Sequence, residues 1–270
     1  MCRIAGIIGN KNVKPENIVK ALLSMESGGK DATGMAWFDG EQVWTMKSPM
    51  MASDFVENQD VRRELPRAAK AKWILLHTRQ ATHGGPENNL NNHPIVSQKG
   101  LIIHNGVVSP SMNLSGARGQ TDTEQIMLHI QKYGFKGLEN MNGWLAIAYV
   151  NFKRPDRVYL YRDGAPIFYS SNGFFAFAST QAILKDGFDI ESTKTLPIGK
   201  VFKVILGNPV LEKVMKVRPH DRIITVGRNP AFLPWFLRDG SQSQDHEASK
   251  KGQFLGYKYQ TVPYQRSFIP

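Results

Sequence analysis

The sequence predicts an α+β fold in which two β-sheets pack together and helices cover their outer faces. Apolar segments of strand length dominate the chain, above all in residues 144–206, where strand follows strand with one short helix among them. Amphipathic helical segments are inserted earlier, at 15–27 and 121–133. With 270 residues, 41% of them hydrophobic, the chain is long enough to bury a substantial core.

The first half of the chain is expected to begin with a buried strand and then a helix. Pro15 suits the first turn of that helix, and Gly28 and Gly29 end it as an ordinary turn. Asp39-Gly40 is a strong turn dipeptide and predicts a hairpin between two strands. The strands expected in this half are residues 3–9, 35–38, 42–47, 73–79 and 100–104.

The second half is expected to begin with a helix at 121–133, because Thr121 and Glu124 have the spacing of a capping box. A short helix is expected at 181–185. The strands expected in this half are residues 144–152, 157–162, 167–170, 174–178 and 200–206.

Composition excludes several classes of protein. A single cysteine rules out an intramolecular disulfide and argues against a cysteine zinc cage. No apolar run is long enough for a membrane span, and the N-terminal apolar stretch is too short for a secretory signal. We therefore expect a soluble, cytoplasmic protein. The formal charge of +11 is densest after residue 215, where nine basic residues face four acidic ones, and it indicates acidic partners without specifying them.

The single cysteine, Cys2, directly follows the initiator methionine. Methionine is normally removed before a small residue, so the mature chain would carry a thiol and a free α-amino group on one residue. An α-amine titrates near neutral pH and can serve as the general base for the thiol. Taken alone, Cys2 is better explained as a chance cysteine; the rest of the sequence reverses that preference and favours a nucleophile.

Four polar segments lie at the ends of expected strands or at a helix start: 77–84 (His-Thr-Arg-Gln-Ala-Thr-His-Gly), 92–94 (Asn-His-Pro), 104–106 (His-Asn-Gly) and 121–124 (Thr-Asp-Thr-Glu). With Cys2 they closely resemble the class II glutamine amidotransferases, the N-terminal-nucleophile glutaminases. Segments 29–34, 162–166 and 177–179 are similar to further motifs of that family, and the order along the chain is the same. The resemblance covers residues 2 to about 206 and implies a four-layer α/β/β/α sandwich of the N-terminal-nucleophile hydrolase type.

The resemblance also implies how the site would bind glutamine. Arg79 has a planar guanidinium suited to a bidentate grip on a carboxylate, and it would hold the α-carboxylate of L-glutamine. Thr82 and His83 would line the substrate pocket, with His83 a weaker candidate for general base than the α-amine. Asp122 would bind the α-ammonium group. A surface ion pair for Arg79 and a purely structural helix-start role for Asp122 are the alternatives.

Asn105 and Gly106 follow an apolar strand and by themselves could form only a tight turn. The resemblance implies an oxyanion hole, in which the Asn105 amide and the Gly106 N–H would face the oxygen that becomes negative when Cys2 attacks. The sugar-amidating members of the family have tryptophan where this chain has Gln80. That difference leaves glutamine hydrolysis plausible and puts tight ammonia channelling in doubt. No cofactor or metal is expected, because no phosphate-binding loop, zinc-ligand spacing or dinucleotide motif occurs.

Two regions are expected: an amidotransferase domain at 2–217 and a C-terminal extension at 218–270. Residues 229–270 combine an aromatic cluster with a polar, low-complexity stretch, and we expect them to dock a separate enzyme or subunit that binds the ammonia acceptor. Packing of this tail on its own core is an equal alternative, and nucleic-acid binding is the weakest one.

Two other functions stay open at this point. The chain could be an N-terminal-nucleophile amidase for a different amide, or a non-catalytic interaction protein on the same scaffold.

Overall fold

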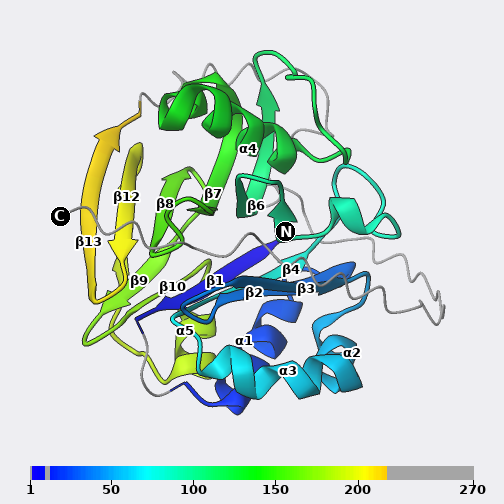
Figure 1. Ribbon diagram of the computed structural model, residues 1–270, viewed down its shortest axis with the longest axis vertical. Helices are drawn as coiled ribbons and strands as arrows, with labels where there is room; N and C mark the ends of the chain where they lie inside the picture. The colour runs from blue at the N-terminus through cyan, green and yellow to red at the C-terminus, as the bar shows by residue number, and fades with distance from the viewer. Residues whose placement is uncertain (1, 10–12, 218–270) are drawn as a thin grey trace, which may run out of the picture.

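The computed structural model describes residues 2–9 and 13–217. These residues form four layers, in which two antiparallel sheets lie face to face between helices (Figure 1). The helices α1, α2, α3 and α5 cover the lower sheet of the picture, and α4 covers the upper one. The expected α+β arrangement of two packed sheets with external helices is therefore present.

The first sheet contains the N-terminal strand at its centre. Within β1, Ile4 and Ile8 face the second sheet, whereas Ala5 and Ile7 face the helices, so the strand is apolar on both sides. In order across this sheet, the strands are β11 (Lys194–Thr195), β9 (Phe168–Ser171), β10 (Phe175–Ala178), β1 (Arg3–Ile8), β4 (Trp73–Arg79), β2 (Ala32–Phe38) and β3 (Val43–Ser48). Its helices are α1 (Pro15–Glu26), α2 (Ala52–Glu57), α3 (Gln59–Ala69) and α5 (Gln181–Phe188).

The second sheet is built around the long antiparallel pair of β6 and β7, which α4 and η2 connect. In order, its strands are β13 (Asn208–Lys216), β12 (Lys200–Ile205), β8 (Arg157–Asp163), β7 (Met141–Asn151), β6 (Gly100–Pro110) and β5 (Ile95–Val96). The helix α4 (Asp122–Tyr133) packs on its outer face, followed by the 3₁₀ helix η2 (Gly134–Asn140), while a second 3₁₀ helix, η1 (Asn89–Asn91), lies in the loop before β5.

Three apolar clusters fill the spaces between the layers. The middle cluster joins the two sheets and includes Trp73, Phe177 and Leu160. A second cluster lies between the first sheet and its helices, and a third lies between the second sheet and α4. Burial of apolar area on both faces of both sheets is the main source of stability in such a fold.

The strand β6 differs from its expected form in a way that matters for the site. The sequence predicted a strand at 100–104 with Asn105-Gly106 at its end, but the strand continues to Pro110 because residues 105–110 pair with β7. On its other side β6 pairs with β5 only through Leu101 and Ile102. From His104 onward, that edge of β6 is therefore open to side chains from other elements.

Other differences are smaller. The helices α2 and α3 and the strands β5, β11 and β13 were not expected from the sequence. The capping box of α4 is only half formed: the Thr121 hydroxyl accepts from the Glu124 N–H, but the Glu124 carboxylate accepts from Arg118 and Gly119 instead. Within the described part of the chain, no helix is both long and apolar enough to cross a membrane. The extension at 218–270 lies outside the described residues.

Candidate active site

Cys2 lies immediately before β1, at the end of β4. Since β1 and β4 are antiparallel and Arg3 pairs with Thr78, the first residues of β1 meet the last residues of β4. The Cys2 sulfur lies 3.4 Å from the backbone nitrogen of Gln80 and 3.5 Å from its carbonyl oxygen. The fold therefore places the candidate nucleophile directly beside the 77–84 motif.

The environment of Cys2 has opposing effects on its thiol. Desolvation has the largest influence and raises the pKa, whereas the backbone hydrogen bond to Gln80 and the positive charge of Arg79 lower it; the negative charge of Asp122 raises it. The net result is a raised pKa. At neutral pH the sulfur is therefore mainly a thiol, so a nucleophile at this position needs a general base.

The guanidinium group of Arg79 is buried and held by neutral oxygen atoms. Its Nη1 donates to the Asn92 side-chain oxygen at 3.0 Å, and its Nη2 donates to the carbonyls of His83 at 2.5 Å and Gly84 at 2.7 Å. No carboxylate forms an ion pair with Arg79 within the described residues. The orientation of the Arg79 guanidinium is thus fixed, and its positive charge is available to bind an anion.

The loop that holds Arg79 is itself fixed by a run of asparagines. The Asn92 side chain donates to the Pro86 carbonyl at 2.7 Å and to the Asn89 side chain at 3.0 Å. Asn91 donates to the Gly85 carbonyl at 3.0 Å and accepts from the Gln120 N–H at 2.8 Å. From the sequence, Asn92 was recognised only as part of the 92–94 motif. The four asparagines among residues 88–92 are the sequence feature that could have indicated a loop held by side-chain amides.

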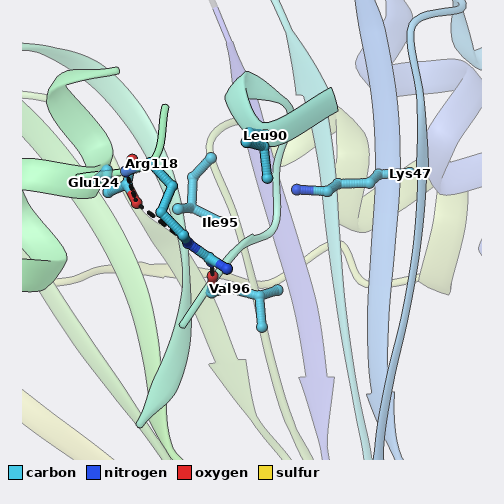
Figure 2. A pocket seen from close by; sticks show the side chains of 6 residues that line it. All are labelled: Lys47, Leu90, Ile95, Val96, Arg118 and Glu124. Carbon is cyan, nitrogen blue, oxygen red and sulfur yellow. Dashed lines mark hydrogen bonds and ion pairs between the residues drawn. The ribbon is translucent and has the colours of Figure 1, made fainter. Parts of the chain in front are cut away.

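Lys47 of β3 supports the same loop from the other side. Its ammonium group is buried and donates to the carbonyls of Asn92 at 2.6 Å and Pro94 at 3.0 Å. Burial lowers the pKa of Lys47 to about 7. Figure 2 shows Lys47 pointing toward the strand segment that carries Ile95, with Glu124 on the far side of that segment. No local sequence pattern indicates that this lysine at a strand end is buried.

Asn105 and Gly106 lie inside β6, not in a turn. The Asn105 amide nitrogen lies 3.5 Å from the Ser179 hydroxyl, which also accepts from the Ile4 N–H of β1 at 2.8 Å, and the Asn105 side-chain oxygen has no partner in the described chain. Gly106 has φ +145°, and a Cβ there would lie 2.0 Å from the Trp144 carbonyl oxygen. Only glycine fits this position.

Asp122 is the first residue of α4 and lies against the open edge of β6. Its carboxylate accepts from the Val108 N–H at 2.9 Å and lies 4.0 Å from the His104 ring. The other carboxylate oxygen accepts from the Thr123 hydroxyl at 3.4 Å, so both oxygens are engaged in structure. The structural role of Asp122 is thus present, and binding of an ammonium group stays a prediction.

Three buried histidines connect the two sheets behind these residues. The rings of His77 and His93 are stacked at 3.9 Å, and the Thr123 hydroxyl lies 3.0 Å from His93 Nε2 and 2.9 Å from His104 Nδ1. His77 donates from Nε2 to the His104 carbonyl at 2.9 Å. Desolvation lowers the pKa of all three, to about 3 for His77, so they are neutral at pH 7.

Thr82 and His83, expected to line the substrate pocket, are exposed, and the His83 ring lies 3.3 Å from the Thr82 hydroxyl. It is the His83 carbonyl that takes part in holding Arg79. A pocket-lining role for Thr82 and His83 stays a prediction, as do the catalytic and binding roles of the other candidates. In the described residues no group of three or more His, Cys, Asp or Glu could hold a metal ion.

Comparison with known structures identifies the fold. The B. subtilis glutamine phosphoribosylpyrophosphate amidotransferase aligns over 80% of this chain and 50% of its own, with 17% identity and a TM-score of 0.59. A structure described as the allosteric regulatory enzyme of purine biosynthesis covers the same shares, with 19% identity and a TM-score of 0.62. A glutamine aminotransferase class-II domain protein from Silicibacter pomeroyi is covered completely, with 15% identity and a TM-score of 0.52. The expected α/β/β/α sandwich of the N-terminal-nucleophile hydrolase type is confirmed.

Sequence relatives narrow the class further. A glutamine–fructose-6-phosphate aminotransferase from Rhizobium meliloti is 29% identical over 72% of this chain and 34% of its own length. The enzyme of the same name from Campylobacter jejuni is 30% identical over 64% and 31%. No family model matches the chain.

The predicted resemblance to the class II glutamine amidotransferases is thereby confirmed, since the sequence relatives are named as glutamine-dependent aminotransferases and one structural neighbour as a class-II glutamine aminotransferase domain protein. The chain spans about a third of the length of the curated relatives that it matches.

Proposed function

We propose that this chain is the glutaminase component of a glutamine amidotransferase, which hydrolyses the side-chain amide of L-glutamine to glutamate and ammonia. The observation that carries the proposal is the joint position of Cys2 and Arg79. A sole cysteine next to the chain start lies beside the end of β4, where a buried guanidinium has neutral partners and no ion pair in the described structure.

Recognition of a free amino acid follows from the two charged groups. Arg79 retains N–H donors for the α-carboxylate of glutamine, because its three hydrogen bonds leave two of the five guanidinium N–H groups unused. Asp122 would take the α-ammonium group. A peptide-bound glutamine lacks both charges, so this pair selects the free amino acid.

The first half of the reaction forms a thioester. The α-amine of mature Cys2 takes the thiol proton, and the sulfur attacks the side-chain carbonyl carbon of glutamine. The Asn105 side-chain amide and the Gly106 N–H donate to the resulting oxyanion. As the oxyanion collapses, the carbon–nitrogen bond breaks and the α-ammonium returns its proton to the leaving ammonia.

The second half consumes water. With the amine again unprotonated, it takes a proton from a water molecule, which attacks the γ-glutamyl thioester and displaces the Cys2 thiolate. Glutamate leaves and the thiolate is reprotonated. An α-amine suits this repeated exchange because its usual pKa lies near neutral pH, whereas the buried histidines are neutral and held by other groups.

We propose further that the ammonia passes to an acceptor held by a separate domain or subunit, docked through residues 229–270. Two facts support this: the curated relatives are about three times as long as the matched region, and they are named for transfer to fructose 6-phosphate. A cytoplasmic location fits a free cysteine that must stay reduced.

Steady-state assay of glutamate and ammonia release by the purified mature chain tests the proposal. We expect release from L-glutamine, none above background after Cys2→Ala, and poor turnover of glutamine analogues without the α-carboxylate or the α-amine. Preference for an analogue over L-glutamine would instead support an amidase for another amide. Intact-mass measurement should show that Met1 has been removed; an active enzyme that keeps Met1 contradicts the α-amine mechanism.

A further inference from the structure

Asp31 connects the start of β2 to the segment that follows β4. Its backbone N–H donates to the Arg79 carbonyl at 3.0 Å, and its carboxylate oxygen Oδ2 accepts from the Ala81 N–H at 2.6 Å. The same Oδ2 accepts from the Gln80 side-chain amide at 3.0 Å. One residue therefore holds the chain immediately before, at and after Gln80.

Close packing of the two backbones reinforces this connection. A Cβ on Gly29, two residues before Asp31, would lie 2.4 Å from the Arg79 carbonyl carbon. Gly29 is thus not the ordinary turn glycine that the sequence predicted, because its lack of a side chain lets the two segments touch. The peptide of Gln80 has little freedom to move away from Asp31.

That peptide is the one in contact with the candidate nucleophile. The Gln80 N–H points at the Cys2 sulfur across 3.4 Å. A backbone N–H stabilises a thiolate more than a neutral thiol, because a hydrogen bond to a charged acceptor is about twice as strong as one to a neutral acceptor. The position of this one donor therefore affects how readily Cys2 ionises.

We propose that Asp31 is a positioning residue that holds the Gln80 N–H against the sulfur of Cys2, with the Gln80 side chain as a second tie to the same carboxylate. This inference rests on the proposed role of Cys2 as the nucleophile. It also gives Gln80 a function of its own: in place of the tryptophan of the sugar-amidating relatives, this chain has an amide that secures the backbone beside the nucleophile.

The competing explanation is electrostatic, since the charge of Asp31 also acts on Arg79. Among the described residues, the charged groups that act on Cys2 are Arg79 of β4, Asp122 of α4 and Arg3 of β1. Removing the negative charge of Asp31 leaves Arg79 less compensated, which favours the thiolate. Loss of the hydrogen bonds from Ala81 and Gln80 to the Asp31 carboxylate lets the Gln80 N–H move away from the sulfur, which disfavours the thiolate. The two explanations therefore predict shifts of opposite sign.

The experiment is the pH dependence of alkylation by iodoacetamide on the mature full-length chain. Cys2 is the only cysteine, so the rate reports on one thiol. In Asp31→Ala we expect the midpoint to move up by about one pH unit, with alkylation about tenfold slower below the midpoint. Asp31→Asn is the matched control, because its side-chain oxygen can still accept from Ala81 while its charge is gone; its midpoint should stay or move down.

Equal shifts of the two variants in the same direction would overturn the proposal. Circular dichroism at the assay temperature checks that each variant is folded. If Asp31→Ala does not fold, Gln80→Ala replaces it: this variant keeps the Ala81 bond, and we expect a smaller upward shift, whereas no shift overturns the second tie.

Alkylation does not require glutamine, so the result is independent of the proposed function. A chain that fails to hydrolyse glutamine but shows the opposite shifts keeps the positioning role and loses the glutaminase. A chain that hydrolyses glutamine but shows equal shifts keeps the glutaminase and loses the positioning role.

Discussion

The two sides of the candidate site are built by different means. On one side, Arg79 is held by a loop whose geometry depends on side-chain amides and on the buried amine of Lys47. On the other side, Asn105 and Gly106 belong to a long strand whose position is set by continuous pairing with β7. A single substitution can remove one of the side-chain hydrogen bonds that hold the loop. The strand is held by backbone hydrogen bonds, which a side-chain substitution does not remove.

Substitutions on the two sides should therefore change different kinetic constants. The loop side would contact the α-carboxylate, which is the same in substrate and transition state, so weakening it should change binding. The strand side would contact an oxygen that is charged only during reaction, so weakening it should change turnover.

Asn105→Ala should lower kcat by about 10²–10³ with little change in KM, because one oxyanion donor is lost. Steady-state kinetics with L-glutamine measures both constants. Because Asn105 also contacts Ser179, Ser179→Ala is the control for loss of that contact alone and should cost less. An effect of Asn105→Ala on KM alone would show that the oxyanion assignment is wrong.

Arg79→Lys should raise KM for glutamine by about 10–100-fold with a smaller change in kcat, because a lysine keeps the charge but cannot grip a carboxylate in two places. The same variant should discriminate less against an analogue that lacks the α-carboxylate. If replacing glutamine with that analogue raises KM by the same factor in the wild type and in Arg79→Lys, Arg79 does not bind the carboxylate.

Asn92→Ala should raise KM about fivefold, since it removes one of the three hydrogen bonds that orient the Arg79 guanidinium, together with the Asn92 bonds to Pro86 and Asn89, and leaves the guanidinium in place. Asn88→Ala is the matched control: it removes an asparagine of the same loop whose side chain caps η1 and does not contact Arg79. Equal kinetic effects of the two variants would indicate that the loop acts only through its overall stability.

The histidines that join the two sides should make stability depend on pH. The folded-state pKa of His77 is lowered to about 3, so between about pH 6.5 and 3 the unfolded chain binds a proton that folded His77 does not. The free energy of unfolding should fall as the pH decreases through this range, by about 1.4 kcal/mol per pH unit for this residue.

Urea unfolding at about pH 7.5 and about pH 5.5 measures this dependence. His77→Gln keeps an N–H donor but does not titrate, so its stability should fall less steeply on acidification than that of the wild type. The difference between the two proteins at about pH 7.5 serves as the baseline for the substitution itself. Parallel pH dependences would show that His77 does not contribute.

Local sequence patterns predicted the strand bounds well where pairing and pattern agree. The expected strand at 73–79 matches β4 residue for residue, and the helix from Pro15 is one residue shorter than expected. The end of β6 was wrong because Asn-Gly is locally a turn dipeptide, and only pairing with β7 shows that it continues as strand. Helix α3 was missed because charged residues and Pro66 conceal an apolar stripe of Val61, Leu65 and Ala68.

The sequence predicted which residues form the candidate site, but not how their side chains are held in position. The order of the motifs along the chain assigned Cys2, Arg79, Asn105 and Asp122 to one candidate site. The structure places these residues on adjoining elements. The ties of Asp31 and Asn92 depend on contacts between segments far apart in the chain, which no local pattern encodes.

The most direct test of the central claim is to trap the covalent intermediate. The mature chain is mixed with L-glutamine, quenched with acid during turnover, digested, and analysed by mass spectrometry of the N-terminal peptide. We expect a γ-glutamyl group on the Cys2 sulfur that disappears once glutamine is exhausted and never forms in Cys2→Ala. Glutamate release that continues in Cys2→Ala, or an adduct at another residue, would contradict it.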